Sequence, residues 1–488
     1  MSDLEQKKAL IKAEIVDKKY TEYEFQEFVV KKTKAEAFNL EAIDMKHLQD
    51  YIAEFKKQSK DKGTDIGSTI DSLRTLDTSE NQGNTMTVNC KKLEKSPLND
   101  KEVVVIIKNP KIVETSIFLQ KYVNYELETP LMNWLVRRRY SDFEWLRTTL
   151  AKYHPGYVLP PLPSKKISNR RFEIDFIAKR MASLQKFMDT LCLNENIKAT
   201  EPLNCFLYMT DRNQFEAKMK ELSSYQPSPF IEESKTFNGT LTISVDDENN
   251  EKYFANITKY FQIQTQLFER LNGNLRQFLM NFNATCRNLD AITEDMKLIY
   301  LLNNKISMRE EITRSYDEFS SLMKNWGRIM AKQNALIKTH VKDFYKYIKL
   351  EGLAFQELLK TREDVKNKYA AENQRLSAKK ERLWQANDPT KWEVIDEFNK
   401  VDKNLLGKDK EYSLSKMCTR ETTVVENMKK QLGFLNKMGM DELKVMIDIH
   451  TNKFMNNANL FTQEFYPPLT DAITVFSYVQ MFAAQYSM

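Results

Sequence analysis

Basic side chains recur in three separate segments in the middle of this chain. The first is RRRYSDFEW, residues 137–145, in which three arginines run directly into Tyr140. Planar guanidinium groups suit phosphate oxygens, lysine supplies a point charge, and an aromatic ring can stack on a sugar-like ring. Three such segments could enclose one small anion. The other two segments contribute Lys165, Lys166, Arg170, Arg171, Lys179 and Arg180.

The charge distribution also points to this part of the chain. Residues 101–210 hold 17 basic and 11 acidic side chains, so they account for the whole net charge of +6. A compact basic segment between near-neutral flanks predicts an anionic partner, whether phosphate, lipid or nucleic acid. We expect no nucleic acid, because the interleaved exposed aromatics and strongly basic charge of that class are missing.

Catalysis has no support in the sequence. The four histidines lie far apart, and HExxH, GxSxG and GxxxxGK[ST] are absent. The five cysteines form no CxxC pair, which is typical of reduced cytosolic thiols and predicts neither a metal site nor a cofactor. No apolar run approaches the roughly 20 residues that span a bilayer. We therefore expect a cytoplasmic, soluble or peripheral protein that is not an enzyme.

The elements that must position the basic groups form a small mixed domain. KEVVVIIKNP, SIFLQKYVNYELET and NWLVRRRY are short β-branched and aromatic runs that predict an antiparallel three-stranded sheet. A helix should start near Ser141, and a second should span about 172–192. Between them VLPPLPSKK must be extended, because each proline disfavours the helical conformation in the residue before it.

The C-terminal half predicts long helices. Ten of the 13 prolines lie between Pro97 and Pro229, and only Pro389 follows before Pro467. We expect helices at about 247–303, 307–386 and 390–485. The second carries apolar residues at intervals of 3, 4 or 7, a heptad seam that must pack on neighbouring helices or on a second chain. The seam consists of Ile337, Val341, Phe344, Ile348, Phe355, Leu358, Val365, Tyr369, Leu376 and Leu383.

These patterns divide the chain into five parts. Residues 1–60 are predicted to form a helical segment, and the polar residues 61–94 a flexible linker. The mixed domain would occupy 95–212 and the helical rod 247–488. Between them, 213–246 form a linker in which FEAKMKELSSY is either an amphipathic helix on a membrane surface or a helix docked onto a domain.

In their order, RRRYSDFEWL, LPPLPSK and FIAKRMASLQKFM resemble the motifs of the PX domain, a small phosphoinositide-binding fold. The resemblance implies that Arg139 pairs with the 3-phosphate of phosphatidylinositol 3-phosphate and that Tyr140 stacks on the inositol ring. It assigns Lys165 to the 1-phosphate and Arg180 to the inositol hydroxyls. The loop ISNRR is shorter than in many PX domains, so this module alone should bind membranes weakly. Accessory membrane contacts are expected from Arg138, Lys166, Ile167, Arg170 and Arg171.

A PX domain followed by three long helices resembles the sorting nexins with a C-terminal BAR domain, and ERLWQANDPTKWEV resembles the tip loop between the second and third BAR helices. The resemblance implies a homodimer or a heterodimer with another BAR-containing sorting nexin. It also implies a peripheral protein on endosomes that senses or stabilises membrane curvature during sorting. The N-terminal helices could bind a cargo or coat protein. The alternative is an interaction scaffold that assembles protein partners without remodelling membranes.

Overall fold

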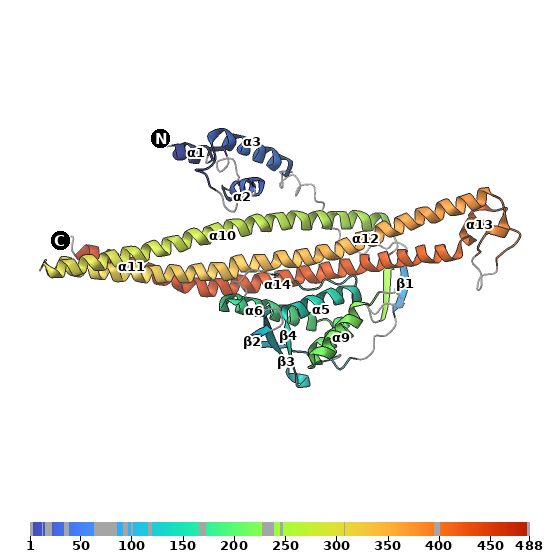
Figure 1. Ribbon diagram of the computed structural model, residues 1–488, viewed down its shortest axis with the longest axis horizontal. Coiled ribbons are helices and arrows are strands. Elements are labelled where there is room, and N and C mark those ends of the chain that lie inside the picture. The colour runs from blue at the N-terminus through green and yellow to red at the C-terminus, as the bar shows by residue number, and fades with distance from the viewer. Residues whose placement is uncertain are drawn as a thin grey trace. The chain divides into compact units, whose positions relative to one another are not determined.

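The computed structural model describes residues 3–11, 13–14, 22–33, 39–62, 85–90, 96–98, 101–115, 120–163, 165, 172–226, 239–244, 247–306, 308–394 and 401–485. The chain forms two compact units, Met1–Asp77 and Thr78–Met488. The second unit combines a three-stranded antiparallel sheet and its helices with a long all-helical rod (Figure 1). The predicted fold class, an α+β domain followed by an all-α rod with extra N-terminal helices, is confirmed.

The N-terminal unit contains α1 (Asp3–Ile11), α2 (Glu22–Thr33) and α3 (Met45–Lys62). Its core is small but contiguous, and in it the rings of Phe25 and Phe55 meet edge to face with centroids 5.5 Å apart. The Asp44 carboxylate accepts the backbone N–H of His47 at 2.9 Å and so caps the start of α3. These helices therefore pack on one another through a core of their own.

The sheet of the second unit has the order β2 (Ile106–Thr115), β3 (Gln120–Thr129) and β4 (Trp134–Arg139), all antiparallel. Asn109, at a bulge in β2, has a positive φ of 46°. The short 3-10 turn Pro130–Met132 (η2) joins β3 to β4, and Asn133 after it has a φ of 51°. Asparagine tolerates this left-handed conformation better than most residues do, which suits it to both turns.

Five helices complete what we call the α/β domain, residues 96–226. They are α5 (Tyr140–Tyr153), α6 (Ile174–Cys192), α7 (Glu195–Lys198), α8 (Glu201–Tyr208) and α9 (Arg212–Ser223). The apolar face of α9 joins the core of this domain, because Phe215 and Leu222 are buried and Met219 packs against them. Of the two readings of FEAKMKELSSY, docking onto a domain is therefore what the structure supports.

The rod consists of α10 (Asp247–Lys305), α11 (Glu310–Leu336), a π-helical turn (η5, Ile337–Asp343), α12 (Phe344–Gln385) and α14 (Thr419–Gln485), which run side by side (Figure 1). Ile348, Phe355, Leu358 and Leu376 of the heptad seam are buried, and its other members are half-buried. Phe355 stacks on Phe261 of α10 with ring centroids 4.7 Å apart. The seam thus packs on neighbouring helices of the same chain, as one of the predicted options requires.

The third rod helix begins at Thr419, about 30 residues later than predicted. Pro389 lies at the tip as expected, in the 3-10 turn Pro389–Lys391 (η6), but the chain then continues through a folded tip with the short helix α13 (Lys410–Lys416). Trp392 and Met417 are buried there against Leu376 of α12. This small core, with an antiparallel bridge between Val394 and Met417, holds the tip in shape. The predicted start at residue 390 was therefore wrong.

Regular structure also lies within both predicted linkers. Strand β1 (Thr85–Cys90) precedes the α/β domain and pairs antiparallel with β5 (Gly239–Ser244), which follows it. Val88 and Ile243 of this two-stranded sheet pack on Phe434, Leu435 and Met438 of α14. The chain before and after the α/β domain is therefore joined at one place on the rod.

The α/β domain itself also contacts the rod. Arg147 of α5 forms an ion pair with Glu357 of α12 at 2.8 Å. Gly156, whose φ of 101° favours glycine, lies against Met438 of α14, where an added Cβ would come within 3.1 Å of a side-chain carbon. The backbone N–H of Val158 donates to the Glu442 carboxylate at 3.3 Å, and burial raises the pKa of Glu442 to about 7.

We expect the contact between the α/β domain and the rod to weaken as the pH rises between about 5 and 7. Because its pKa is raised, Glu442 holds a proton in the docked state that it releases once exposed. The contribution of protonated Glu442 to the stability of this contact is therefore complete below its ordinary pKa of 4.5. It is lost as the pH rises past about 7. Amide-exchange protection factors around residues 158 and 442, measured across this range, check this expectation. In the Glu442→Gln variant the protection factors should not fall with pH in this way. If they do not fall in the parent either, the expectation is contradicted.

Candidate functional site

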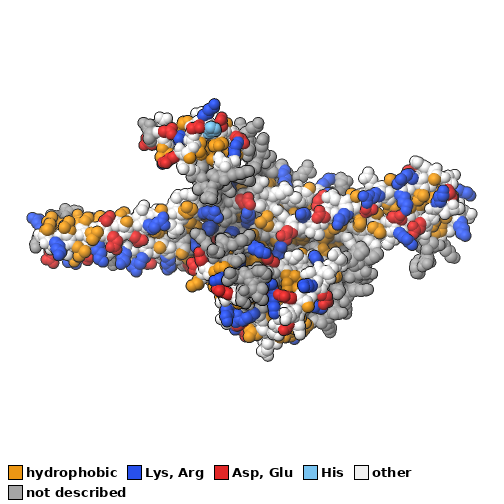
Figure 2. All heavy atoms as spheres, viewed as in Figure 1, with side chains coloured by type: hydrophobic (Ala, Val, Ile, Leu, Met, Phe, Trp, Pro, Cys, Tyr) orange, Lys and Arg blue, Asp and Glu red, His pale blue; other side chains and the backbone are white. Residues whose placement is uncertain are grey.

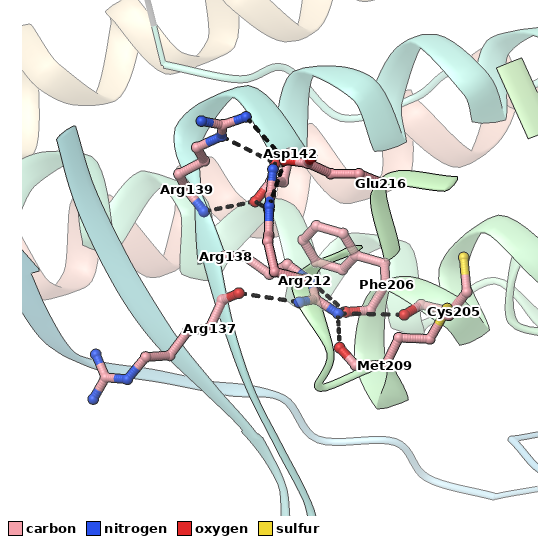
Figure 3. A network of polar contacts seen from close by, with 9 residues as sticks. All are labelled: Arg137, Arg138, Arg139, Asp142, Cys205, Phe206, Met209, Arg212 and Glu216. Atoms are coloured by element: carbon pink, nitrogen blue, oxygen red, sulfur yellow. Dashed lines mark hydrogen bonds and ion pairs between the residues drawn. The ribbon is translucent and has the colours of Figure 1, made fainter. Parts of the chain in front are cut away.

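The three consecutive arginines at the end of β4 take three different environments (Figure 3). Side chains alternate across a strand, so Val136 and Arg138 point into the domain while Leu135 and Arg137 face outward. Arg137 forms an ion pair with Glu126 of β3 at 2.6 Å and remains partly exposed. Arg139 is the last strand residue and comes directly before α5.

Arg138 is buried, with only 1% of its surface exposed. Its guanidinium donates to the backbone carbonyls of Phe206 at 2.9 Å and Met209 at 2.6 Å, and it lies 3.9 Å from the ring centroid of Phe215. Burial lowers the pKa of Arg138 to about 10, so the group remains charged near neutral pH. The expectation that Arg138 is an accessory membrane contact is contradicted, because a covered guanidinium cannot reach a lipid phosphate.

A completely buried carboxylate, Asp142, lies at the start of α5. Its Oδ2 accepts the backbone N–H of Arg139 at 2.9 Å, which caps the helix. Arg212 of α9 donates to both carboxylate oxygens of Asp142, at 2.8 and 3.1 Å. This bidentate pair supplies the opposite charge that a buried carboxylate needs. It also ties α9 to the first turn of α5, directly after the arginine cluster.

Among the described residues, the Arg139 side chain makes only long contacts with carboxylate oxygens. Its Nε lies 3.5 Å from Oδ1 of Asp142, and its Nη2 lies 3.7 Å from Oε1 of Glu216. Within the part of the chain that the structure describes, Nε has no hydrogen-bond partner, although it is covered from solvent. The side chain as a whole is 39% exposed. Arg139 therefore keeps donors that an external anion could use.

Tyr140 links the other expected site residues. Its hydroxyl donates to the backbone carbonyl of Pro163 at 2.5 Å, which fixes the ring beside the proline-rich loop. The Arg180 guanidinium lies 4.3 Å from the Tyr140 ring centroid and 4.6 Å from that of Phe176, and Arg180 is largely buried. Both distances are within the range of a cation–π interaction. Burial raises the pKa of Tyr140, so its hydroxyl stays protonated near neutral pH.

Lys165 completes the set that the structure describes. Its ammonium group forms an ion pair with Glu144 of α5 at 2.8 Å and is well exposed. Arg139, Tyr140, Lys165 and Arg180 thus gather at the start of α5, the proline-rich loop and α6. The expected accessory contacts Lys166, Ile167, Arg170 and Arg171 lie outside the described residues.

Sequence reasoning did not find three residues of this network: Arg212, Glu216 and Glu144. Arg212 and Glu216 are visible as an i, i+4 pair of opposite charge, at 2.8 Å in the structure. Nothing in that spacing indicates a contact with Asp142, 70 residues earlier in the chain. These groups place carboxylates beside both Arg139 and Lys165.

A three-stranded sheet, a proline-rich loop and helices that gather basic groups around a tyrosine define a phosphoinositide-binding module of the PX type. Comparison with known families agrees, since the PX domain model matches residues 127–210. The rod that follows has the long antiparallel helices of a BAR domain. The class defined by this fold and site is a PX domain joined to a BAR-type rod.

Relatives of known sequence are sorting nexins. Sorting nexin 1 of Arabidopsis thaliana is 24% identical over 325 residues, which cover 59% of this chain and 80% of that protein. Sorting nexin-4 of Eremothecium gossypii is 24% identical over 364 residues, 69% of this chain and 85% of that protein. Sorting nexin-7 of Mus musculus is 38% identical over 94 residues, 19% of this chain and 22% of that protein.

A solved structure supports the fold. In the cryo-EM structure of the SNX-BAR Mvp1 tetramer, one chain is similar with a TM-score of 0.58 and 15% identity, and the match covers 77% of this chain and all of that one. The PX match, the relatives and this shared fold together support a PX-BAR sorting nexin, a class that fits a role in membrane-associated trafficking. Among the described residues, no helix is long and apolar enough to cross a membrane.

We expect Arg138→Ala to lower the free energy of unfolding of the PX domain by about 3 kcal/mol, because the carbonyls of Phe206 and Met209 would be left buried without a donor. Arg139→Ala should cost less than about 1 kcal/mol, since its contacts are long and partly exposed. Denaturant titration, followed by amide exchange in α5 and α8, separates the two variants. Equal destabilisation would contradict the assignment of Arg138 to structure.

Proposed function

We propose that this chain binds phosphatidylinositol 3-phosphate on endosomal membranes through the site around Arg139 and Tyr140. The observation that carries the proposal is the contrast between two neighbouring arginines. Arg138 donates its hydrogen bonds to backbone carbonyls, whereas Arg139 lies no closer than 3.5 Å to any carboxylate among the residues that the structure describes. A phosphate beside Arg139 would accept the short charge-assisted hydrogen bonds that the protein leaves unmade.

The other site residues support a ring-shaped headgroup. Tyr140 is held by its hydrogen bond to Pro163, so its ring is already oriented before a ligand arrives. Arg180 reaches the same ring from α6 and can donate to hydroxyl groups. Among the described residues of the proline-rich loop, Lys165 is an exposed cation that we assign to the diester phosphate. In this proposal the chain acts by binding and carries out no reaction.

The rod extends the proposal to curved membranes. Six apolar side chains at the junction of α10 and α11 are 42 to 62% exposed, and Figure 2 shows hydrophobic side chains gathered on the visible face of this end of the rod. Apolar surface of this kind is typical of an interface. A second copy packed here would give a rod with two headgroup sites. The six residues are Leu298, Leu301, Leu302, Ile306, Met308 and Ile312.

Two linked sites make membrane attachment stronger than either alone, because the second binding event occurs at a high local concentration. Sensing or stabilising curvature would follow from the shape of the joined rods. The alternative, an interaction scaffold that does not read lipid, predicts no dependence on the phosphoinositide. In either case the N-terminal unit, with its own core, is available to a cargo or coat protein.

We expect Arg139→Ala to abolish most of the binding to vesicles that contain phosphatidylinositol 3-phosphate, because it removes the donors assigned to the 3-phosphate. The matched control is Arg137→Ala, which removes one positive charge from the same strand but from an arginine paired with Glu126. Liposome flotation of the full chain, with and without the lipid, measures the difference. Equal binding of both variants and the parent in all conditions would overturn the lipid-binding proposal.

We also expect the full chain to self-associate and the double substitution Leu298→Lys with Leu302→Lys to shift it to monomer at micromolar concentration. Each new charge would otherwise have to be buried in an apolar interface. Val424→Lys is the control, because Val424 is a similarly exposed apolar residue near the other end of the rod. Light scattering coupled to gel filtration gives the mass. A monomeric parent would exclude the homodimer and favour a different rod as partner.

A further inference from the structure

We propose that Glu216 of α9 determines specificity by disfavouring headgroups that carry phosphates in addition to the one bound by Arg139. The inference rests on the proposed phosphoinositide site and names the side chain that selects among its ligands. Glu216 lies outside the motifs that identify this domain and contacts Arg139 from a helix some 70 residues further along the chain.

Glu216 is held in place by a chain of charge pairs. Its Oε1 accepts a hydrogen bond from Nε of Arg212 at 2.8 Å, while the other two nitrogens of Arg212 donate to Asp142. Asp142 is completely buried, so Arg212 cannot leave it without exposing an uncompensated charge to the protein interior. The carboxylate of Glu216 is therefore fixed 3.7 Å from Nη2 of Arg139 instead of moving freely in solvent.

This arrangement places two carboxylates beside Arg139. The positive charges of Arg139 and Arg212 are matched by the negative charges of Asp142 and Glu216, and the third cation next to this group, Arg138, is buried and donates to backbone carbonyls. A phosphate at Arg139 gains charge-assisted hydrogen bonds there, because Glu216 is too distant to form them itself. A further phosphate on the same ring would meet no unpaired exposed cation among these residues and would be repelled by Glu216.

The second cationic group of the pocket follows the same pattern. Lys165 has Glu144 at 2.8 Å, so its charge is also partly compensated before a ligand binds. The sequence RRR suggests a broad positive field, but Arg138 is buried and Arg137 is paired with Glu126. Among the described residues, the site is thus better suited to one correctly placed phosphate than to a high total charge.

The test compares Glu216→Gln with Glu221→Gln in the full-length chain. The glutamine introduced by Glu216→Gln can still accept the hydrogen bond from Arg212 but carries no charge. Glu221 is on the same helix and pairs with Lys218 at 2.7 Å, so its substitution removes an equal charge without touching the pocket. Vesicles of phosphatidylcholine carry either phosphatidylinositol 3-phosphate or phosphatidylinositol 3,4-bisphosphate or 3,5-bisphosphate, with total surface charge matched by phosphatidylserine.

We expect Glu216→Gln to raise the affinity for phosphatidylinositol 3-phosphate by about twofold to fivefold, as suits a partly exposed charge pair. Its affinity for at least one bisphosphate lipid should rise by a larger factor. The ratio of the two affinities, which in the parent favours the lipid with one ring phosphate, should therefore become smaller. Glu221→Gln should keep the preference of the parent. An unchanged preference, an equal gain for all three lipids, or a loss of binding in Glu216→Gln would each overturn the inference.

Soluble headgroups separate pocket selection from the attraction of the rod to charged membranes. Calorimetry with inositol 1,3-bisphosphate and with inositol 1,3,4- and 1,3,5-trisphosphate should show the same smaller ratio of affinities in Glu216→Gln. A change seen only on vesicles would contradict the inference.

The proposed function and the role of Glu216 can be contradicted by different results. If Arg139→Ala binds phosphatidylinositol 3-phosphate as the parent does, the site is wrong; if Arg139→Ala loses binding and Glu216→Gln keeps the parent preference, only the role of Glu216 is wrong.

Discussion

The candidate site depends on one buried charge, the carboxylate of Asp142. Such a charge is costly unless it is paired and hydrogen-bonded, and here the backbone of Arg139 and the guanidinium of Arg212 meet that requirement. The same three contacts start α5, fix the end of β4 and tie α9 to the domain. Arg139 can be held at the pocket with unused donors because the demand of Asp142 for positive charge is met by Arg212.

The rod follows from a second constraint, the need of long helices to bury an apolar seam. The seam of α12 packs on α10 and α14, and Phe355 stacks on Phe261 at its centre. Among the described residues, the apolar side chains at the α10–α11 junction remain exposed, which is why we propose that a second chain covers them. At the other end the tip closes on its own small core around Trp392, and there a second chain is not required.

Much of this architecture was predictable because it depends on local patterns. Short β-branched and aromatic runs, proline spacing and heptads predicted the sheet, the extended loop and the rod. Alternation along a strand was an indication left unused: Arg138 is two residues from the apolar Val136, so both belong on the inward face. The contact of Arg212 with Asp142 could not be predicted, since it joins residues 70 positions apart with no shared pattern. The late start of α14 was missed because the tip is held by packing of Trp392 and Met417 instead of by turn residues alone.

The buried charge of Asp142 and the apolar seam of the rod both bear on the affinity of the protein for a membrane. A pocket whose cations are already compensated by Glu216 and Glu144 gains little from general attraction to an anionic surface, so one site should bind weakly and selectively. A high affinity for the membrane then requires more than one site. In our proposal the exposed apolar end of the rod provides a second site by joining two chains. The β1–β5 sheet and the contacts of Arg147 and Glu442 attach each PX domain to its own rod, so that linking the rods also links the pockets. In the division of tasks that we propose, carboxylates beside the cations set selectivity and association of the rods sets affinity.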